Sequence, residues 1–321
     1  MRRLLPLVWI AATLLAQEQQ PTFKTQAPLV VVPVTVSTKD GERIWDLKAD
    51  DFQLLDNGKP REITVEPWGT YESHVSLVVV VQTSSISKAA LLKVKKVASM
   101  LDSITGDGGE VAVITADSEV KTRLDFTKTW EPIQEAFEEL YASGGNNGYI
   151  LDGVDSAITL LSQRPQGQRR LILLLSEARD RGSKSKASDV LTRAQLNSVS
   201  IYTASYSAYV TPFTTKASEL QPEAAGGLDI FGLFMEIAHA AQQNVGHTLA
   251  SYTGGRQLSF ETLHHLENDL TEIGKEVHSQ YQISFVPTSE QSPVYHELKV
   301  KLTDHPDAVI RARPGYWNGS K

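Results

Sequence analysis

The sequence predicts an α/β fold, in which a mostly parallel sheet carries helices on both faces and antiparallel strands flank it at both ends of the chain. Three observations support this prediction. Strand and helix patterns alternate from residue 75 to residue 277, which is typical of parallel sheets. The runs at 77–81 and 171–175 are continuously apolar, as in strands buried on both faces. The two flanking regions alternate polar and apolar residues, as antiparallel strands with one solvent-facing side do.

The order of elements starts with an amino-terminal β region. Residues 27–38 are rich in β-branched side chains, and short strands are expected at 51–55 and 63–68 around the turn Asp56-Asn57-Gly58-Lys59-Pro60. The central region is expected to contain strands at 75–81, 110–116, 170–175, 199–204 and 254–258. The helices that alternate with them are expected at 88–103, 131–141, 150–161, 188–197, 231–252 and 259–277. The carboxyl-terminal region is expected to add alternating strands at 281–286, 295–302 and 308–313.

Neither β flank has many strands, and small isolated sheets are marginally stable. We therefore expect the two flanks to pack together as one small antiparallel β-sandwich, with the α/β domain inserted between them. The expected divisions of the chain are a signal peptide at 1–16, a linker at 17–26, sandwich parts at 27–72 and 280–318, and the α/β domain at 73–279.

The amino terminus has the features of a secretory signal peptide. Arg2 and Arg3 precede a short apolar run, and the small residue Ala16 offers a cleavage site. The run is shorter than the roughly 20 apolar residues of a membrane-spanning helix. We expect an exported protein, periplasmic or secreted, with no integral membrane segment after cleavage.

Composition and motifs argue against several functions. The net charge of −7 disfavours a nucleic-acid surface, which needs a basic face. The chain has no cysteine, so thiol chemistry and disulfides are excluded. It has neither a Gly-x-Ser-x-Gly elbow nor a His-x-x-x-His pair. We therefore expect a protein that is not an enzyme.

Polar loops follow two of the buried strands, at residues 82–87 and 176–183. Because parallel strands end at the same edge of a sheet, both loops are expected at the edge where such folds bind ligands. An Asp-x-Ser-x-Ser loop facing a distant Asp would supply hard oxygen ligands for Mg²⁺. In this chain Gln82 takes the place of the first Asp, Ile86 that of the second Ser, and Glu177 that of the distant Asp.

The order and spacing of several segments resemble the von Willebrand factor type A-related proteins of the acidobacterial type. The matching segments are 29–36, 47–60, Thr83-Ser84, Gly144-Gly145, Leu151-Asp152-Gly153-Val154, 281–287 and Arg311-Ala312-Arg313-Pro314-Gly315-Tyr316-Trp317. The resemblance implies a Rossmann-like A domain, export, and a binding rather than catalytic role. It also implies recognition of protein partners through a metal-ion-dependent adhesion site, where a partner's carboxylate completes the coordination of the ion.

The chain departs from that adhesion site. Ser84 keeps the first hydroxyl, whereas the threonine of the second loop falls near Asn146, Asn147 or Gly148, depending on where a gap is placed. An amide is a weaker ligand than a carboxylate, and its NH₂ group donates hydrogen bonds. Candidate ligands of such a degenerate site are Gln82, Ser84, Asn146 and Glu177. We expect no cofactor, with weak Mg²⁺ or Mn²⁺ binding as the alternative.

The sequence thus predicts an exported protein-interaction or adhesion module with a degenerate metal site and an unidentified protein partner. Two alternatives stay open: a Mg²⁺- or Mn²⁺-dependent protein binder, and a structural component of the cell envelope with no specific ligand at this edge. Residues expected to contact the partner are Thr83, Ser85, Ser87, Asn147, Asp180, Tyr209 and Phe213.

Overall fold

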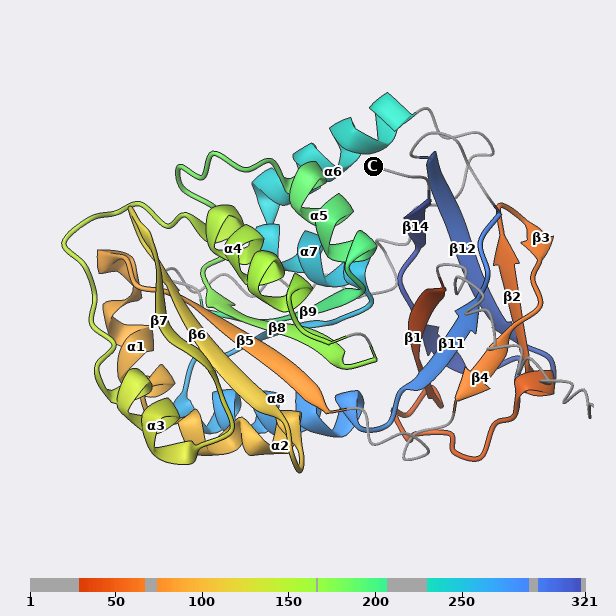
Figure 1. Cartoon of the computed structure of the whole chain (residues 1–321), viewed down its shortest axis with the longest axis horizontal. Helices are drawn as coiled ribbons and strands as arrows, with labels where there is room; N and C mark the ends of the chain where they lie inside the picture. The colour runs from red at the N-terminus through yellow and green to blue at the C-terminus, as the bar shows by residue number, and fades with distance from the viewer. Residues whose placement is uncertain (1–28, 67–73, 166, 207–229, 289–293, 319–321) are drawn as a thin grey trace, which may run out of the picture.

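The computed structural model describes residues 29–66, 74–165, 167–206, 230–288 and 294–318, and it contains three sheets (Figure 1). The central sheet has six strands in the order β10-β9-β8-β5-β6-β7. Their bounds are Val75–Gln82 (β5), Glu110–Ala116 (β6), Val120–Thr127 (β7), Arg169–Ser176 (β8), Val199–Ser205 (β9) and Gln257–Ser259 (β10). All neighbours pair in parallel except β6 and β7. This is the doubly wound order of a Rossmann-like fold, which confirms the predicted fold class.

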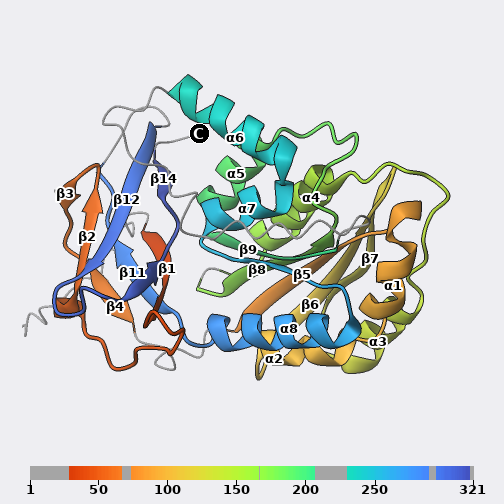
Figure 2. The ribbon, with the colours of Figure 1, turned by 180° about the vertical axis from the view of Figure 1, so that it is seen from behind.

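Helices cover both faces of the central sheet (Figures 1 and 2). One face packs against α1 (Lys88–Val94), α2 (Asp102–Thr105), α3 (Trp130–Glu138) and α8 (Leu263–Val277). The other packs against α4 (Ile150–Ser162), α5 (Ala187–Leu196), α6 (Ile230–Gln243) and α7 (Val245–Thr253). Strand β5 lies between the two cores, because Val79 and Val81 belong to one and Val78 and Val80 to the other.

Strands from both ends of the chain form two four-stranded antiparallel sheets, ordered β13-β1-β11-β4 and β14-β12-β2-β3. The amino-terminal strands are β1 (Val30–Ser37), β2 (Phe52–Asp56), β3 (Lys59–Pro60) and β4 (Thr64–Glu66). The carboxyl-terminal strands are β11 (Tyr281–Phe285), β12 (Val294–Leu302), β13 (Val309–Arg311) and β14 (Gly315–Asn318). The two sheets share one apolar core and form a β-sandwich. Each sheet contains two strands from the amino-terminal flank and two from the carboxyl-terminal flank. Short 3₁₀ turns lie at Ala49–Asp51 (η1), Ser85–Ser87 (η2) and Ala98–Met100 (η3).

A buried polar cluster joins the two flanks inside the sandwich. Asp56, at the end of β2, is 1% exposed and accepts hydrogen bonds from Arg61 Nε at 2.8 Å and Tyr316 Oη at 3.2 Å. Its other carboxylate oxygen lies 2.7 Å from Nδ1 of His296 on β12. The turn that begins at Asp56 and the carboxyl-terminal tyrosine, 260 residues apart, therefore meet at one buried carboxylate.

A second buried carboxylate joins the α/β domain to the sandwich. Glu276 lies in the last turn of α8 and is fully buried. It accepts a hydrogen bond from Tyr202 Oη at 3.2 Å, lies 3.3 Å from Arg256 Nε, and pairs with Arg311 of β13. The sandwich thus adjoins the amino ends of the parallel strands, on the opposite side from their carboxyl ends (Figure 1).

The secondary structure departs from the sequence prediction in several strands and in two helices. Strand β7 was not predicted, because it is an edge strand whose exposed polar residues hide the alternating pattern. Strands β3 and β14 were not predicted either, because they are only two and four residues long. The helices predicted at 88–103 and 231–252 are each divided. Asn244 ends α6 by taking an extended conformation, and its side chain then caps α7 by accepting a hydrogen bond from the His247 N–H.

Among the helices that the structure describes, none is long and apolar enough to cross a membrane. The signal peptide and linker predicted at 1–16 and 17–26 lie outside the described residues.

Candidate functional site

Three loops meet at the carboxyl ends of the central parallel strands, and we call residues 82–88, 143–149 and 177–186 together the carboxyl edge. Strands β5 and β8 are hydrogen-bonded neighbours in which Val81 pairs with Leu175, so Gln82 and Glu177 come out of the sheet side by side. The sequence prediction that these two loops share one edge is therefore correct.

The Gln82 side chain bridges the ends of the two strands. It is 1% exposed, its Oε1 accepts a hydrogen bond from the Glu177 N–H at 2.9 Å, and its Nε2 donates to Ser84 Oγ at 2.9 Å. Only the oxygen of an amide can accept from an N–H, so the Glu177 N–H fixes the orientation of the amide. The NH₂ group consequently points at the serine hydroxyl that a metal site would use as a ligand.

Gly148 makes room for this bridge. A Cβ atom at position 148 would lie 2.5 Å from Gln82 Nε2 and 2.9 Å from Gln82 Cδ, well inside contact distance. Gly148 also exchanges two backbone hydrogen bonds with Arg181, at 3.2 Å and 3.0 Å. The second and third loops are therefore tied together directly above the Gln82 amide.

The hydroxyl groups of the first loop point inward. Ser84 and Ser87 are fully buried, their Oγ atoms are 3.3 Å apart, and Tyr206 Oη donates to Ser87 Oγ at 2.5 Å. Thr83 is 2% exposed and donates to an Asp117 carboxylate oxygen at 3.3 Å. Thr83 and Ser87 were predicted to contact a partner, and their burial removes both from the accessible surface.

The second loop is fastened to the first. Ser85 N donates to the Gly145 carbonyl at 2.8 Å, and Ser85 Oγ donates to Asn146 Oδ1 at 2.5 Å. Asn146 therefore binds Ser85, and the structure does not bring its amide into contact with Gln82. Asn147, which was also predicted to contact a partner, is exposed.

Glu177 occupies the position at which the predicted metal site required an acidic side chain. It is 6% exposed, and its carboxylate lies 3.7 Å from Arg181 Nε. Burial raises the pKa of Glu177, and Arg181 opposes that rise. Among the described residues, none donates a hydrogen bond to its Oε2 atom.

Two other carboxylates at this edge accept hydrogen bonds from backbone N–H groups. Asp180 accepts from Leu151 N at 3.0 Å and Ser183 Oγ at 2.6 Å, and Asp152 accepts from Ser185 N at 2.8 Å. Burial alone would raise the pKa of Asp152, but hydrogen bonds from Ser185 and Lys184 bring it below its usual value. Asp180, predicted to contact a partner, is half-buried and fixes the start of α4. The anchoring role of Asp152 was not foreseen, because it depends on backbone N–H groups more than thirty residues away.

These residues do not fit a divalent cation. Mg²⁺ needs near-octahedral oxygen ligands at about 2.0–2.1 Å, usually with at least one carboxylate. Here an amide NH₂ faces Ser84, Gly148 offers no side chain, and Glu177 lies beside a guanidinium. Within the described part of the chain, no group of three acidic, histidine or cysteine side chains is arranged to hold a metal.

Two predicted contact residues, Tyr209 and Phe213, lie outside the described residues. Tyr206, which begins the same region, is buried and packs edge-on against Phe260 with ring centroids 5.9 Å apart. Its aromatic ring therefore belongs to the core, and its hydroxyl is hydrogen-bonded to Ser87.

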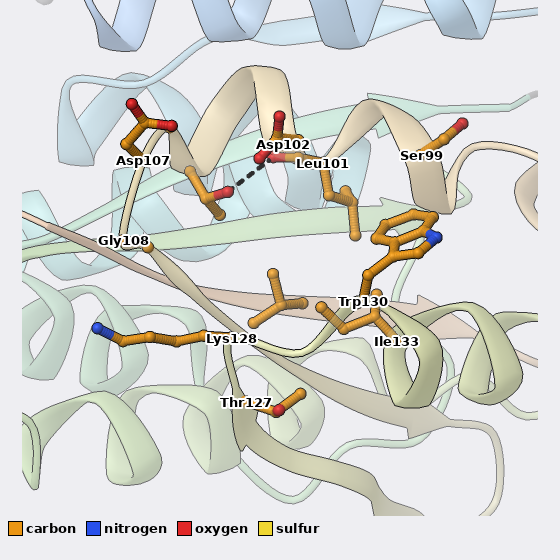
Figure 3. Close-up of a pocket in the computed structure, with 13 residues that line it drawn as sticks. Ser99, Leu101, Asp102, Asp107, Gly108, Thr127, Lys128, Trp130 and Ile133 are labelled. Carbon is orange, nitrogen blue, oxygen red and sulfur yellow. Dashed lines mark hydrogen bonds between the residues drawn. The ribbon is translucent and has the colours of Figure 1, made fainter.

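A cavity of about 430 Å³ lies at the opposite edge of the sheet, where β6 begins and β7 ends (Figure 3). Its apolar wall includes Leu101 and Ile133, and the figure shows Trp130 on one side with Lys128 and Asp107 toward the other. Because it opens at the amino end of β6, the cavity is separate from the carboxyl edge.

No family model matches the chain, and no curated protein matches it. Solved structures similar to it include a von Willebrand factor type A protein from Catenulispora acidiphila (10% identity, TM-score 0.48, 92% of this chain and 75% of that one). Another is proximal thread matrix protein 1 from mussel byssus with a zinc-occupied MIDAS motif (13% identity, TM-score 0.45, 70% and 50%). A third is an aerotolerance-related membrane protein from Bacteroides fragilis (13% identity, TM-score 0.44, 63% and 99%).

Proposed function

We propose that this chain is an exported protein-interaction module of the von Willebrand factor A type, and that it binds its partner at the carboxyl edge without a metal ion. The observation that carries the proposal is the Gln82 bridge, which closes the strand ends with hydrogen bonds where an adhesion site would present a cation. Loops held by a rigid sheet are the usual binding elements of such scaffolds.

A binding role accounts for this edge better than a catalytic one. Ser84, the hydroxyl that follows the central strand, is fully buried and contacts Gln82 and Ser87 rather than a general base. A nucleophilic serine needs both access to substrate and an adjacent base. Export rests on the arginine-led apolar run at the amino terminus.

The metal-independent part of the proposal is tested by calorimetric titration of Mg²⁺ and Mn²⁺. The native chain is compared with a Gln82→Asp/Ile86→Ser/Glu177→Asp variant, which restores the missing oxygen ligands on the same scaffold. We expect heat of binding from the variant alone. Saturable binding to the native chain would refute metal independence and favour the Mg²⁺- or Mn²⁺-dependent alternative.

The location of the binding surface is tested by blocking it. Since the chain has no cysteine, Asn147→Cys provides a single attachment point for a polyethylene glycol maleimide. Lys301→Cys, exposed on β12 of the sandwich, is the matched control. Proteins captured from an envelope extract of the source cells in the presence of EDTA are identified by mass spectrometry.

We expect a specific partner that is lost when position 147 carries the polymer and retained when position 301 does. A partner captured equally by both conjugates would place the interface elsewhere. If neither conjugate nor the unmodified chain captures a specific partner, the structural-component alternative is favoured.

A further inference from the structure

The third loop of the carboxyl edge carries a concentration of positive charge, and we call residues 179–186 the basic segment. It reads Arg179-Asp180-Arg181-Gly182-Ser183-Lys184-Ser185-Lys186, and its four basic side chains are all exposed. The chain as a whole has a net charge of −7, so this segment has the opposite sign to the rest of the molecule. Such contrast in sign is a basis for selective recognition of anionic partners.

The acidic side chains at this edge neutralise the basic segment only in part. Asp180 and Asp152 are engaged by backbone N–H groups, and Glu177 makes only a 3.7 Å contact with Arg181. Lys184 lies near enough to Asp152 to help lower the pKa of that carboxyl. Arg179 and Lys186 form no ion pair with any residue that the structure describes.

The backbone of the basic segment is held in one conformation. Arg181 is bridged to Gly148 by two backbone hydrogen bonds, and Asp152 accepts hydrogen bonds from the N–H groups of Lys184 and Ser185. Gly182 has a φ of 103°, where a side chain would be strained, and an added Cβ would meet the Tyr149 ring at 2.8 Å. Binding to a loop that is already ordered costs less conformational entropy than binding to a mobile one.

We propose that the basic segment binds an acidic peptide segment of the protein partner directly, with Arg179, Arg181 and Lys186 as the main contacts. Guanidinium groups form two parallel hydrogen bonds with a carboxylate, so they are suited to aspartate and glutamate side chains. Nucleic acid is a less suitable ligand, because a polynucleotide is longer than the eight-residue basic segment. Its outer phosphates would meet the rest of the chain, which is negatively charged. The inference rests on the proposed function and assigns chemistry to its partner.

The probe is a fluorescently labelled oligoglutamate peptide, and binding to the full chain is followed by fluorescence anisotropy at low salt. The test variant is Arg179→Gln/Arg181→Gln/Lys186→Gln, which removes the three main contacts and leaves the backbone hydrogen bonds between positions 148 and 181 and the Gln82 bridge in place. The matched control is Lys59→Gln/Lys299→Gln/Lys301→Gln, which removes the same number of exposed charges from the sandwich. Circular dichroism establishes that both variants are folded.

We expect the test variant to bind the peptide about ten-fold more weakly than the native chain, as three exposed charge contacts would give, and the control to change by less than about two-fold. Binding should weaken between about 50 and 200 mM salt, and an oligoglutamine peptide should not bind. An equal loss in both variants, or no binding of oligoglutamate to the native chain, would overturn the inference. Tighter binding of an oligonucleotide of equal length would reassign the segment to nucleic acid.

The partner-capture experiment separates this inference from the proposed function. If the partner is lost with the polymer at position 147 but is still captured by the test variant, the carboxyl edge is the interface and the basic segment is not its main contact. If neither the polymer conjugate at position 147 nor the test variant captures the partner, both the proposed function and this inference are supported.

Discussion

Gly148 and Gln82 provide a direct test of how the carboxyl edge is built. In Gly148→Ala, the added methyl group would overlap the Gln82 amide, with Nε2 at 2.5 Å and Cδ at 2.9 Å. Carbon atoms in contact are about 3.5–4.0 Å apart, so the amide must move by about 1 Å. That displacement breaks the hydrogen bonds to the Glu177 N–H and to Ser84 Oγ, both 2.9 Å long.

The expected loss follows from those two hydrogen bonds. Loss of the buried hydrogen bond to Ser84 costs about 1 kcal/mol, and leaving the Glu177 N–H without an acceptor costs about 2 kcal/mol, the middle of the usual range of about 1–3 kcal/mol. Replacing glycine by alanine restricts the unfolded chain and returns about 0.4–1 kcal/mol. The net effect of Gly148→Ala is a decrease of about 2–3 kcal/mol in the free energy of unfolding.

The decisive measurement is a double-mutant cycle by urea unfolding, followed by circular dichroism. Gln82→Ala removes the amide and should itself lower stability by about 2–3 kcal/mol. On that background Gly148→Ala should cost nothing or stabilise slightly, which gives a coupling of about 2–3 kcal/mol. Gly144→Ala in the same loop is the control, because its Cβ would meet no atom within 4 Å. Additive effects, within about 0.5 kcal/mol, would show that Gln82 does not occupy this space.

Three further predictions concern buried polar groups. Burial raises the pKa of Asp269 to about 6, so its contribution to stability is most favourable below about pH 4 and declines as the pH rises through 6. Asp269→Asn should therefore raise the free energy of unfolding at pH 8 by about 1–2 kcal/mol but not at pH 4. Urea unfolding at the two pH values measures this difference, and an equal gain at both would contradict a raised pKa of Asp269. Asp56→Ala should lower stability by about 3–5 kcal/mol, whereas Asp307→Ala, at a fully exposed ion pair, should leave the melting temperature nearly unchanged; equal shifts would contradict the role of the buried cluster. Tyr206→Phe should cost about 1–2 kcal/mol through the lost hydrogen bond to Ser87, and an unchanged urea midpoint would argue against that bond.

The sequence by itself determined the main architecture. Continuous apolar runs at 77–81 and 171–175 predicted central strands, and β5 and β8 are indeed buried neighbours in a parallel sheet. The alternating flanks predicted antiparallel strands, and their one-sided apolar pattern required a shared core. These features were predictable because burial imposes a period that local sequence records.

Only the tertiary structure decided how the side chains of the carboxyl edge are oriented. The direction of the Gln82 amide depends on an N–H group ninety-five residues away, and the space that it occupies depends on Gly148. The accessible surface also depends on the fold, because Ser87 turns inward while Arg179 stays exposed. Long-range hydrogen bonds and close packing select these orientations, and neither leaves a periodic signal in the sequence.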